Sequence, residues 1–343
     1  MPLTSVMMRI FVKKLSVFAL TVLLAGAAHA DWVPRVLSDR YVATVSYGGN
    51  SISYSEDRYA NGPLGALARD VYGVPAYMQS SLNNLLQQQA AANGVTFVSG
   101  TLSGNVNFQV TPQSNGTVLL RMSGLRYDAY TKYSGKKWGI IKYDCTNHLT
   151  LADMTVTAQY GTVDGSLPSD KVGLTMNASS STDCDSNLSW ILPVLGNYII
   201  NKAEGQIDQG VVEGIKGSLT EINSKLVFGR DQNYLASLNR LIPVDKVITL
   251  PDGRTFPIGQ YINNNLAYLI ANSQITLQLG KGVKVEPVLG VGEPSRETFT
   301  GDIINLSVTA PGVSFNARLH EEVNVYWSWK CSVRNPLLSC PIP

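Results

Sequence analysis

Residues 189–226 read SWILPVLGNYIINKAEGQIDQGVVEGIKGSLTEINSKL, and this stretch predicts the element around which the fold is built. Apolar or small residues recur there at intervals of four, namely at Leu195, Ile199, Ala203, Ile207, Val211, Ile215 and Leu219. An α-helix turns about 100° per residue, so each step of four overshoots a turn by roughly 40° and the apolar stripe drifts around the helix. A twisted sheet wrapped around the helix can bury such a stripe. The alternative is two shorter helices with a break near Glu204-Gly205.

The chain opens with a sequence typical of a signal peptide. Residues 9–14 carry three basic side chains, residues 15–28 form an apolar run too short to span a bilayer, and Ala28-His29-Ala30 is a small-x-small cleavage site. We therefore expect residues 1–30 to be removed and the mature protein to begin at Asp31. This predicts a soluble, exported protein, either periplasmic or secreted.

Composition and charge restrict the partners of the mature chain. Removing the three basic residues of the leader leaves 24 basic residues against 25 acidic ones. Such a balance argues against nucleic acid as a partner. Low charge with abundant Val, Tyr, Thr, Ser and Asn is typical of an exported β-rich protein.

Four cysteines remain after cleavage, and in an oxidising compartment an even number favours disulfides. Three pairings are possible, and closeness in sequence favours Cys145 with Cys184 and Cys331 with Cys340. A zinc site is a poor alternative because the spacings do not fit and only two histidines remain. We expect neither a metal nor a cofactor.

Outside the long stretch, the patterns predict a helix at 64–93, interrupted or kinked at Pro75, and a meander of about six strands over 95–176. The expected boundaries are a first domain at 31–229 and a C-terminal α+β region at 230–343, with the latter able to belong to the same domain. A polar loop carrying Cys184 is expected over 177–185, a hairpin around Pro251-Asp252-Gly253 over 247–256, and a helix over 258–272. The strand pattern resumes between Ile275 and Trp329.

Few residues are suited to catalysis. His148 and His320 are the histidines that survive export, and each is interpreted as structural or solvated. Carboxylates could support glycoside hydrolysis if the fold set the right separation, and the candidate pairs are Asp144 with Asp153, Asp183 with Asp185, and Glu321 with Glu322. No phosphate-binding loop is present. We expect a non-enzymatic protein, with a carboxylate hydrolase as a less favoured alternative.

One local cluster combines cations with aromatic rings. The basic members are Arg126, Lys132, Lys136, Lys137 and Lys142, and the interleaved aromatic residues are Tyr127, Tyr130, Tyr133, Trp138 and Tyr143. Such residues favour a rim that touches a membrane surface or lipopolysaccharide. The alternative is a solvated strand face with packing aromatics.

The expected elements follow a particular order. An amphipathic helix precedes amphipathic strands, one cysteine (Cys145) lies in a strand, and a second (Cys184) lies just before a very long helix. This order resembles the tubular lipid-binding (TULIP) superfamily, in particular the bactericidal/permeability-increasing protein group. The resemblance covers roughly residues 64–228. It implies a long helix wrapped in a curved antiparallel sheet, a groove for acyl chains, a strand-to-helix disulfide and no catalysis. No second equivalent module is evident, and the last hundred or so residues are unmatched.

The expected fold class is therefore α+β, with a long amphipathic helix wrapped by a curved antiparallel β-sheet and a mixed, β-rich C-terminal region. The expected function is binding of lipid or another amphiphile, with acyl chains held between helix and sheet. The candidate lining residues are Leu102, Val106, Phe108, Val118, Leu120, Ile199, Ile207, Val211 and Ile215. The alternative is a structural or adhesive protein whose core is filled.

Overall fold

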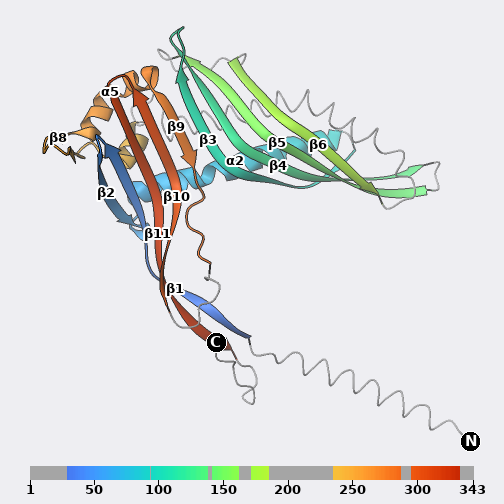
Figure 1. Ribbon diagram of the computed structural model, residues 1–343. Helices are drawn as coiled ribbons and strands as arrows, with labels where there is room; N and C mark the ends of the chain where they lie inside the picture. The colour runs from blue at the N-terminus through green and yellow to red at the C-terminus, as the bar shows by residue number, and fades with distance from the viewer. Residues whose placement is uncertain are drawn as a thin grey trace, which may run out of the picture. The chain divides into compact units, whose positions relative to one another are not determined.

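Antiparallel strands dominate the computed structural model, which describes residues 29–92, 94–137, 141–161, 171–184, 235–286 and 295–332 (Figure 1). Nine strands join one sheet in the order β2-β1-β11-β10-β9-β3-β4-β5-β6. Their bounds are β1 (His29–Tyr47), β2 (Asn50–Asp57), β3 (Thr96–Pro112), β4 (Thr117–Lys137), β5 (Ile141–Gly161), β6 (Val172–Cys184), β9 (Gln274–Leu279), β10 (Arg296–Ala310) and β11 (Val313–Ser332).

The remaining described elements are short, with one exception. The exception is α2 (Pro63–Ala92), a helix of 30 residues. The others are η1 (Arg58–Ala60), α4 (Leu235–Leu241), α5 (Ile258–Asn272) and the two-stranded ribbon of β7 (Ile248–Thr249) with β8 (Thr255–Phe256). The sequence patterns placed α5 and the β7–β8 hairpin correctly.

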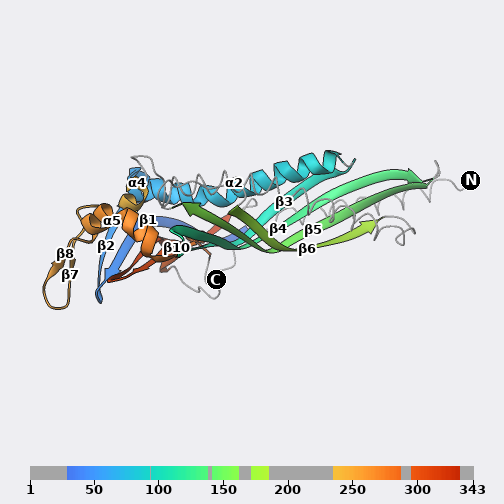
Figure 2. The same ribbon diagram turned by 90° about the horizontal axis from the view of Figure 1, so that it is seen from above.

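The predicted fold class is wrong. The described residues are mostly strand, and the long helix wrapped by a sheet, expected at 189–226, is not shown; that stretch lies outside the described residues. Among the described helices, α2 packs against the sheet, mainly on β3, and comes from a different part of the chain (Figure 2). Helix α5 also contacts β3 and β4. Like the stripe expected at 189–226, the apolar stripe of α2 must be buried against a sheet. Its buried residues recur at helical spacing and cover apolar strands. They include Leu67, Val71, Met78, Leu82 and Leu86.

Polar contacts join the middle of α2 to β3 and β4. The backbone N–H of Leu102 donates to Gln79 Oε1 at 2.9 Å, and the Tyr127 hydroxyl donates to Asn83 Oδ1 at 2.5 Å. Helix α2 continues through Pro75, where the sequence predicted a start or a kink. Its first turn is capped by Glu56, whose carboxylate accepts from the backbone N–H groups of Leu64 and Gly65 at 2.9 and 3.0 Å.

A buried carboxylate ties three further segments together. Glu321 on β11 is only 4% exposed. It accepts hydrogen bonds from Arg58 of η1 at 2.5 Å, from the Tyr72 hydroxyl of α2 at 3.0 Å and from the backbone N–H of Val283 at 3.1 Å. Burial together with the Glu321 charge raises the pKa of Tyr72 well above its usual value, so Tyr72 remains a donor. A buried charge is tolerated where several donors satisfy it in this way.

The chain divides into two compact units. The larger comprises Arg40–Val283 and Thr300–Glu322, and the smaller comprises Met1–Asp39, Lys284–Phe299 and Val323–Pro343. The smaller unit contains an aromatic cluster in which Trp327 is buried, packs edge-on against Phe299 and donates its indole N–H to Glu297 at 2.8 Å. The predicted domain boundary at 229/230 falls outside the described residues.

Where about six strands were expected over 95–176, the structure has four longer ones, β3 to β6. Three irregularities lie within these strands. The register shifts in β3 after Gly104, in β4 around Gly124 and in β5 around Asp153. All three residues have positive φ, of +97°, +90° and +52°. They lie in adjacent strands and form what we call the bulge line.

The bulge line keeps the apolar side chains of long strands on one face. In β4 the buried residues Val118, Leu120 and Met122 occupy even positions, whereas Leu125 and Tyr127 occupy odd positions. In β5 the buried positions change in the same way between Leu151 and Met154. Without the extra residue of a bulge, the second half of each strand would turn its apolar side chains to the opposite face.

We predict that Gly124→Ala destabilises the protein by about 2 kcal/mol or more, because a Cβ there would clash with the carbonyl oxygen of Asn105 in a backbone that L residues rarely adopt. Gly116→Ala is the matched control, since Gly116 has φ +74° but open space around the added methyl. Chemical denaturation of both variants measures the difference. Equal losses of unfolding free energy would show that the close approach at the bulge line does not matter.

Candidate functional site

The apolar face of β3 to β6 is the candidate site, and it contains the described residues that the sequence predicted as lipid lining. Val106, Phe108, Val118 and Leu120 are 3–7% exposed and belong to one buried cluster, while Leu102 is partly buried beside it. The register pairs Val110 with Leu120 and Phe108 with Met122. The other predicted lining residues, Ile199, Ile207, Val211 and Ile215, lie outside the described residues.

This face continues across the sheet to its last strand. Leu174 of β6 lies opposite Val156 of β5, and Val172 lies opposite Ala158. The β5 residues are buried, but the β6 residues Val172, Leu174, Met176 and Ala178 are only partly buried. The apolar surface is therefore partly open at β6, the terminal strand in the sheet order.

Sequence reasoning missed much of this face, including Leu149, Leu151, Met154 and Val156 on β5. They lie in a stretch, 149–160, that the sequence predicts as one strand, but the bulge at Asp153 changes the phase of alternation within it, so alternation alone does not place all four on one face. The signal that could have placed them is the change from apolar odd positions, Leu149 and Leu151, to apolar even positions, Met154 and Val156.

Two polar groups on the apolar face have no hydrogen-bond partner in the described part of the chain. They are Thr131 Oγ1 on β4 and the Tyr160 hydroxyl on β5. Burial raises the pKa of Tyr160 to about 12, so its hydroxyl stays protonated and able to donate. Unsatisfied buried polar groups are unusual and call for a partner such as water or a ligand.

The predicted basic and aromatic rim is only partly described. Lys132 is exposed, the side chains of Lys136, Lys137 and Lys142 are not described, and Trp138 lies outside the described residues. Arg126 is engaged by Asp128, to which it donates from Nε at 2.8 Å and from a terminal nitrogen at 2.9 Å. Its charge is therefore neutralised locally.

Asp128 organises a small polar network on the outward face of β4 and β5. The hydrogen bond from Arg126 is the main reason that the pKa of Asp128 falls to about 2, against an opposing effect of burial. Thr150 Oγ1 donates to Asp128 at 2.7 Å, and His148 Nε2 lies 3.5 Å from the same carboxylate. The His148 ring stacks on Tyr130 with centroids 4.5 Å apart. Because the Thr150 hydroxyl donates to Asp128 and not to His148, these groups do not form a nucleophile–base relay.

The carboxylate pairs proposed for hydrolysis are mostly not brought together. Glu321 is buried against Tyr72, whereas the next residue, Glu322, points to the opposite face and pairs with Arg40. Asp144 and Asp153 lie nine positions apart on one strand, roughly 30 Å at the usual rise. Paired catalytic carboxylates need to be within about 10 Å. For the third pair, Asp185 lies outside the described residues.

His320, the second surviving histidine, lies on β11 between Arg318 and Glu322 in sequence. Burial and the nearby Arg318 charge lower the pKa of His320, and its Nδ1 has no partner among the described residues. Within those residues, no group of three or more His, Cys, Asp or Glu side chains could hold a metal ion. None of the described helices is long and apolar enough to cross a membrane.

Cys145 lies directly opposite Cys184 in the register of β5 and β6. Cys145 is buried and is not a free thiol. This register is compatible with the favoured pairing, whose formation stays a prediction. The partner cysteine lies on strand β6 and not on a loop, as the sequence had suggested for residues 177–185. The pairing of Cys331 with Cys340 involves residues whose side chains are not described.

Comparisons with known proteins provide little additional guidance. No protein-family model matches the chain, and the curated proteins contain no match. Among solved structures, the chain is similar to one described as a crystal structure of lipopolysaccharide binding protein, at 12% identity over 86% of this chain and 84% of that one, with a TM-score of 0.29. That neighbour is of the kind that the TULIP resemblance anticipates, but at this TM-score the likeness carries no argument.

We predict that acid weakens the protein partly through Asp128. Its folded pKa of about 2 lies below the ordinary value of 3.8, so the carboxylate contributes stability above about pH 4 and loses it as the pH falls toward 2. Asp128→Asn should therefore show a smaller drop in melting temperature between pH 4 and pH 2 than the wild type. If the melting temperatures of the two proteins fall by the same amount over this pH range, Asp128 does not contribute to the acid sensitivity.

We also predict that Cys145→Ser, Cys184→Ser and the double variant lose the same stability under oxidising conditions, roughly 3–4 kcal/mol, because each removes one loop constraint. Denaturation with and without reductant measures the effect. If the double variant is much less stable than either single variant, or if reductant leaves the wild type unchanged, the two cysteines are not paired with each other.

Proposed function

We propose that this protein is an exported, non-enzymatic binding protein for lipids or other amphiphiles, with acyl chains lying against the apolar face of β3 to β6. The observation that carries the proposal is the continuation of this face to β6, where Val172, Leu174 and Met176 are only partly buried. Each methylene that an acyl chain buries there would contribute about 0.8 kcal/mol.

The dimensions of the open edge suit one hydrocarbon chain. Residues 172–178 of β6 extend for roughly 20 Å at the usual strand rise. An acyl chain occupies about half of the ~30 Å hydrocarbon core of a bilayer, or ~15 Å. The unpaired Thr131 and Tyr160 hydroxyls supply donors that the polar atoms of an amphiphile could accept from.

Export is supported by the leader-like residues 1–30, which lie almost entirely outside the described part of the chain. The absence of catalysis is supported by the separated carboxylates and by the way in which Asp128 and Thr150 are hydrogen-bonded. A membrane surface or lipopolysaccharide is a candidate source of the ligand, through the exposed Lys132 and the lysines near it in sequence.

A structural protein with a filled core is the second candidate function. It is favoured by the deep burial of Val106, Phe108, Val118 and Leu120, since side chains that pack fully together leave no room for a ligand at that point. The two candidate functions differ at β6. Amphiphile binding requires an acyl chain against the partly buried side chains of this strand, whereas a structural role requires no ligand there.

Native mass spectrometry of gently purified protein should show bound lipid, and organic extraction should identify it. We predict that Leu174→Arg reduces the lipid content at least fivefold, because it places a charge on the apolar face beside Val156. Thr175→Arg is the matched control, since Thr175 is exposed on the opposite face of the same strand. A wild-type protein free of lipid would favour the structural alternative, as would equal lipid content in the two folded variants.

A further inference from the structure

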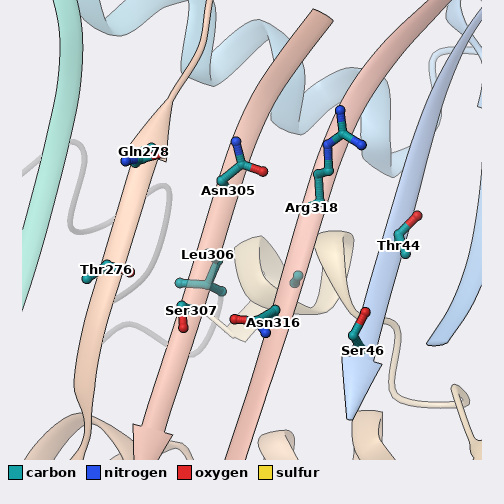
Figure 3. A pocket seen from close by; sticks show the side chains of 10 residues that line it. Thr44, Ser46, Thr276, Gln278, Asn305, Leu306, Ser307, Asn316 and Arg318 are labelled. Carbon is teal, nitrogen blue, oxygen red and sulfur yellow. The ribbon is translucent and has the colours of Figure 1, made fainter. Parts of the chain in front are cut away.

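The sheet face opposite α2 contains a hollow that the amphiphile hypothesis does not use. It extends over β1, β11, β10 and β9, four neighbouring strands of the larger unit (Figure 3). Its volume is about 430 Å³, within the range of small-ligand sites. Since strand residues alternate between faces, the buried Phe315 and Leu319 line the core while Asn316 and Arg318 between them line this hollow.

Hydroxyl and amide side chains dominate the hollow. Eight of its ten lining residues are polar, and the other two, Leu306 and Ala317, belong to the buried cluster. Five of the polar side chains make no hydrogen bond within the described residues, so their donors and acceptors are available. These are Ser46, Thr276, Gln278, Ser307 and Asn316.

The hollow has little net charge. Its one cationic side chain, Arg318, donates from Nε to Asp302 at 2.6 Å, and Asn305 donates to the other oxygen of Asp302 at 2.9 Å. Burial acts to raise the pKa of Asp302, but the hydrogen bonds from Asn305 and Arg318 outweigh it and the pKa is lowered, so this pair stays ionised and neutral overall. No Lys or Glu lines this hollow.

We propose that this hollow binds a neutral, hydroxyl-rich chain, namely a segment of oligosaccharide. Hydroxyls and amides each donate and accept, which matches the paired donor and acceptor character of sugar hydroxyl groups. Four strands at a spacing of about 4.8 Å present these groups over roughly 15 Å, a span that several linked sugar rings can occupy. No aromatic ring lines the hollow, so binding is weak and depends on several hydrogen bonds.

The test uses saturation-transfer NMR on the purified full-length mature protein, with neutral hexasaccharides of glucose and of N-acetylglucosamine as probes and a hexasaccharide of galacturonic acid for comparison. We expect saturation transfer to at least one neutral probe and at least fivefold less transfer in the variant Gln278→Ala with Asn316→Ala. Both positions are exposed, and circular dichroism verifies that this variant is folded.

The matched control is Thr309→Ala with Ser314→Ala. These residues face the same side of β10 and β11 outside the hollow, with their hydroxyl oxygens 3.3 Å apart, and their loss should leave transfer within twofold of the wild type. If the first variant does not fold, Ser307→Arg fills the hollow and should have the same effect. The proposal fails if no neutral probe receives saturation, if hollow and control variants behave alike, or if the acidic probe binds at least as well as the neutral ones.

Discussion

One-sided burial of very long strands is the constraint on which this structure depends. Strands β3, β4 and β5 span 17 to 21 residues. A sheet twists along strands of this length, yet the apolar side chains must all stay on the face that is covered. The bulge line at Gly104, Gly124 and Asp153 lies at one level of three adjacent strands, and in β4 and β5 it changes which alternate positions face the core. Asn177 of β6 supports the line by donating to Asp153 at 2.8 Å.

The consequence is a sheet whose two faces have different chemistry. Helix α2 covers part of the apolar face. The polar groups on that face include Tyr127, which is hydrogen-bonded to Asn83 of the helix, and Tyr160, whose hydroxyl has no partner within the described residues. The opposite face carries hydroxyls, amides and ion pairs. Glu321 and Glu322 illustrate the difference between the faces. Glu321 is buried and hydrogen-bonded to Tyr72 of α2, whereas its neighbour Glu322 faces outward and pairs with Arg40.

The two proposals concern these two faces separately. An amphiphile on β3 to β6 would use apolar contact, which is non-directional, whereas an oligosaccharide over β1, β11, β10 and β9 would use many oriented hydrogen bonds. Neither proposal requires residues 189–226. Either can fail without affecting the other, because their tests alter different strands and different faces.

The sequence by itself determined the local properties of this protein. Alternation identified strands over 95–176, although β6 continues to Cys184, where a loop was expected. Helical spacing identified α5 over Ile258–Asn272, and Pro251-Asp252-Gly253 identified the turn between β7 and β8. It also placed Val106, Phe108, Val118 and Leu120 on one face, because their spacing reports burial directly.

Only the tertiary structure decided which amphipathic helix covers the sheet, where strands continue through a bulge, and which strands become neighbours. The stretches 63–92 and 189–226 both have apolar stripes in sequence, and a stripe alone does not reveal which surface it packs against. The hollow was invisible for the same reason, since Ser46, Gln278, Ser307 and Asn316 lie up to 270 positions apart and come together only because β1, β9, β10 and β11 adjoin in the sheet. Local patterns encode which side of a strand is buried, whereas strand order arises from long-range pairing that leaves no local trace.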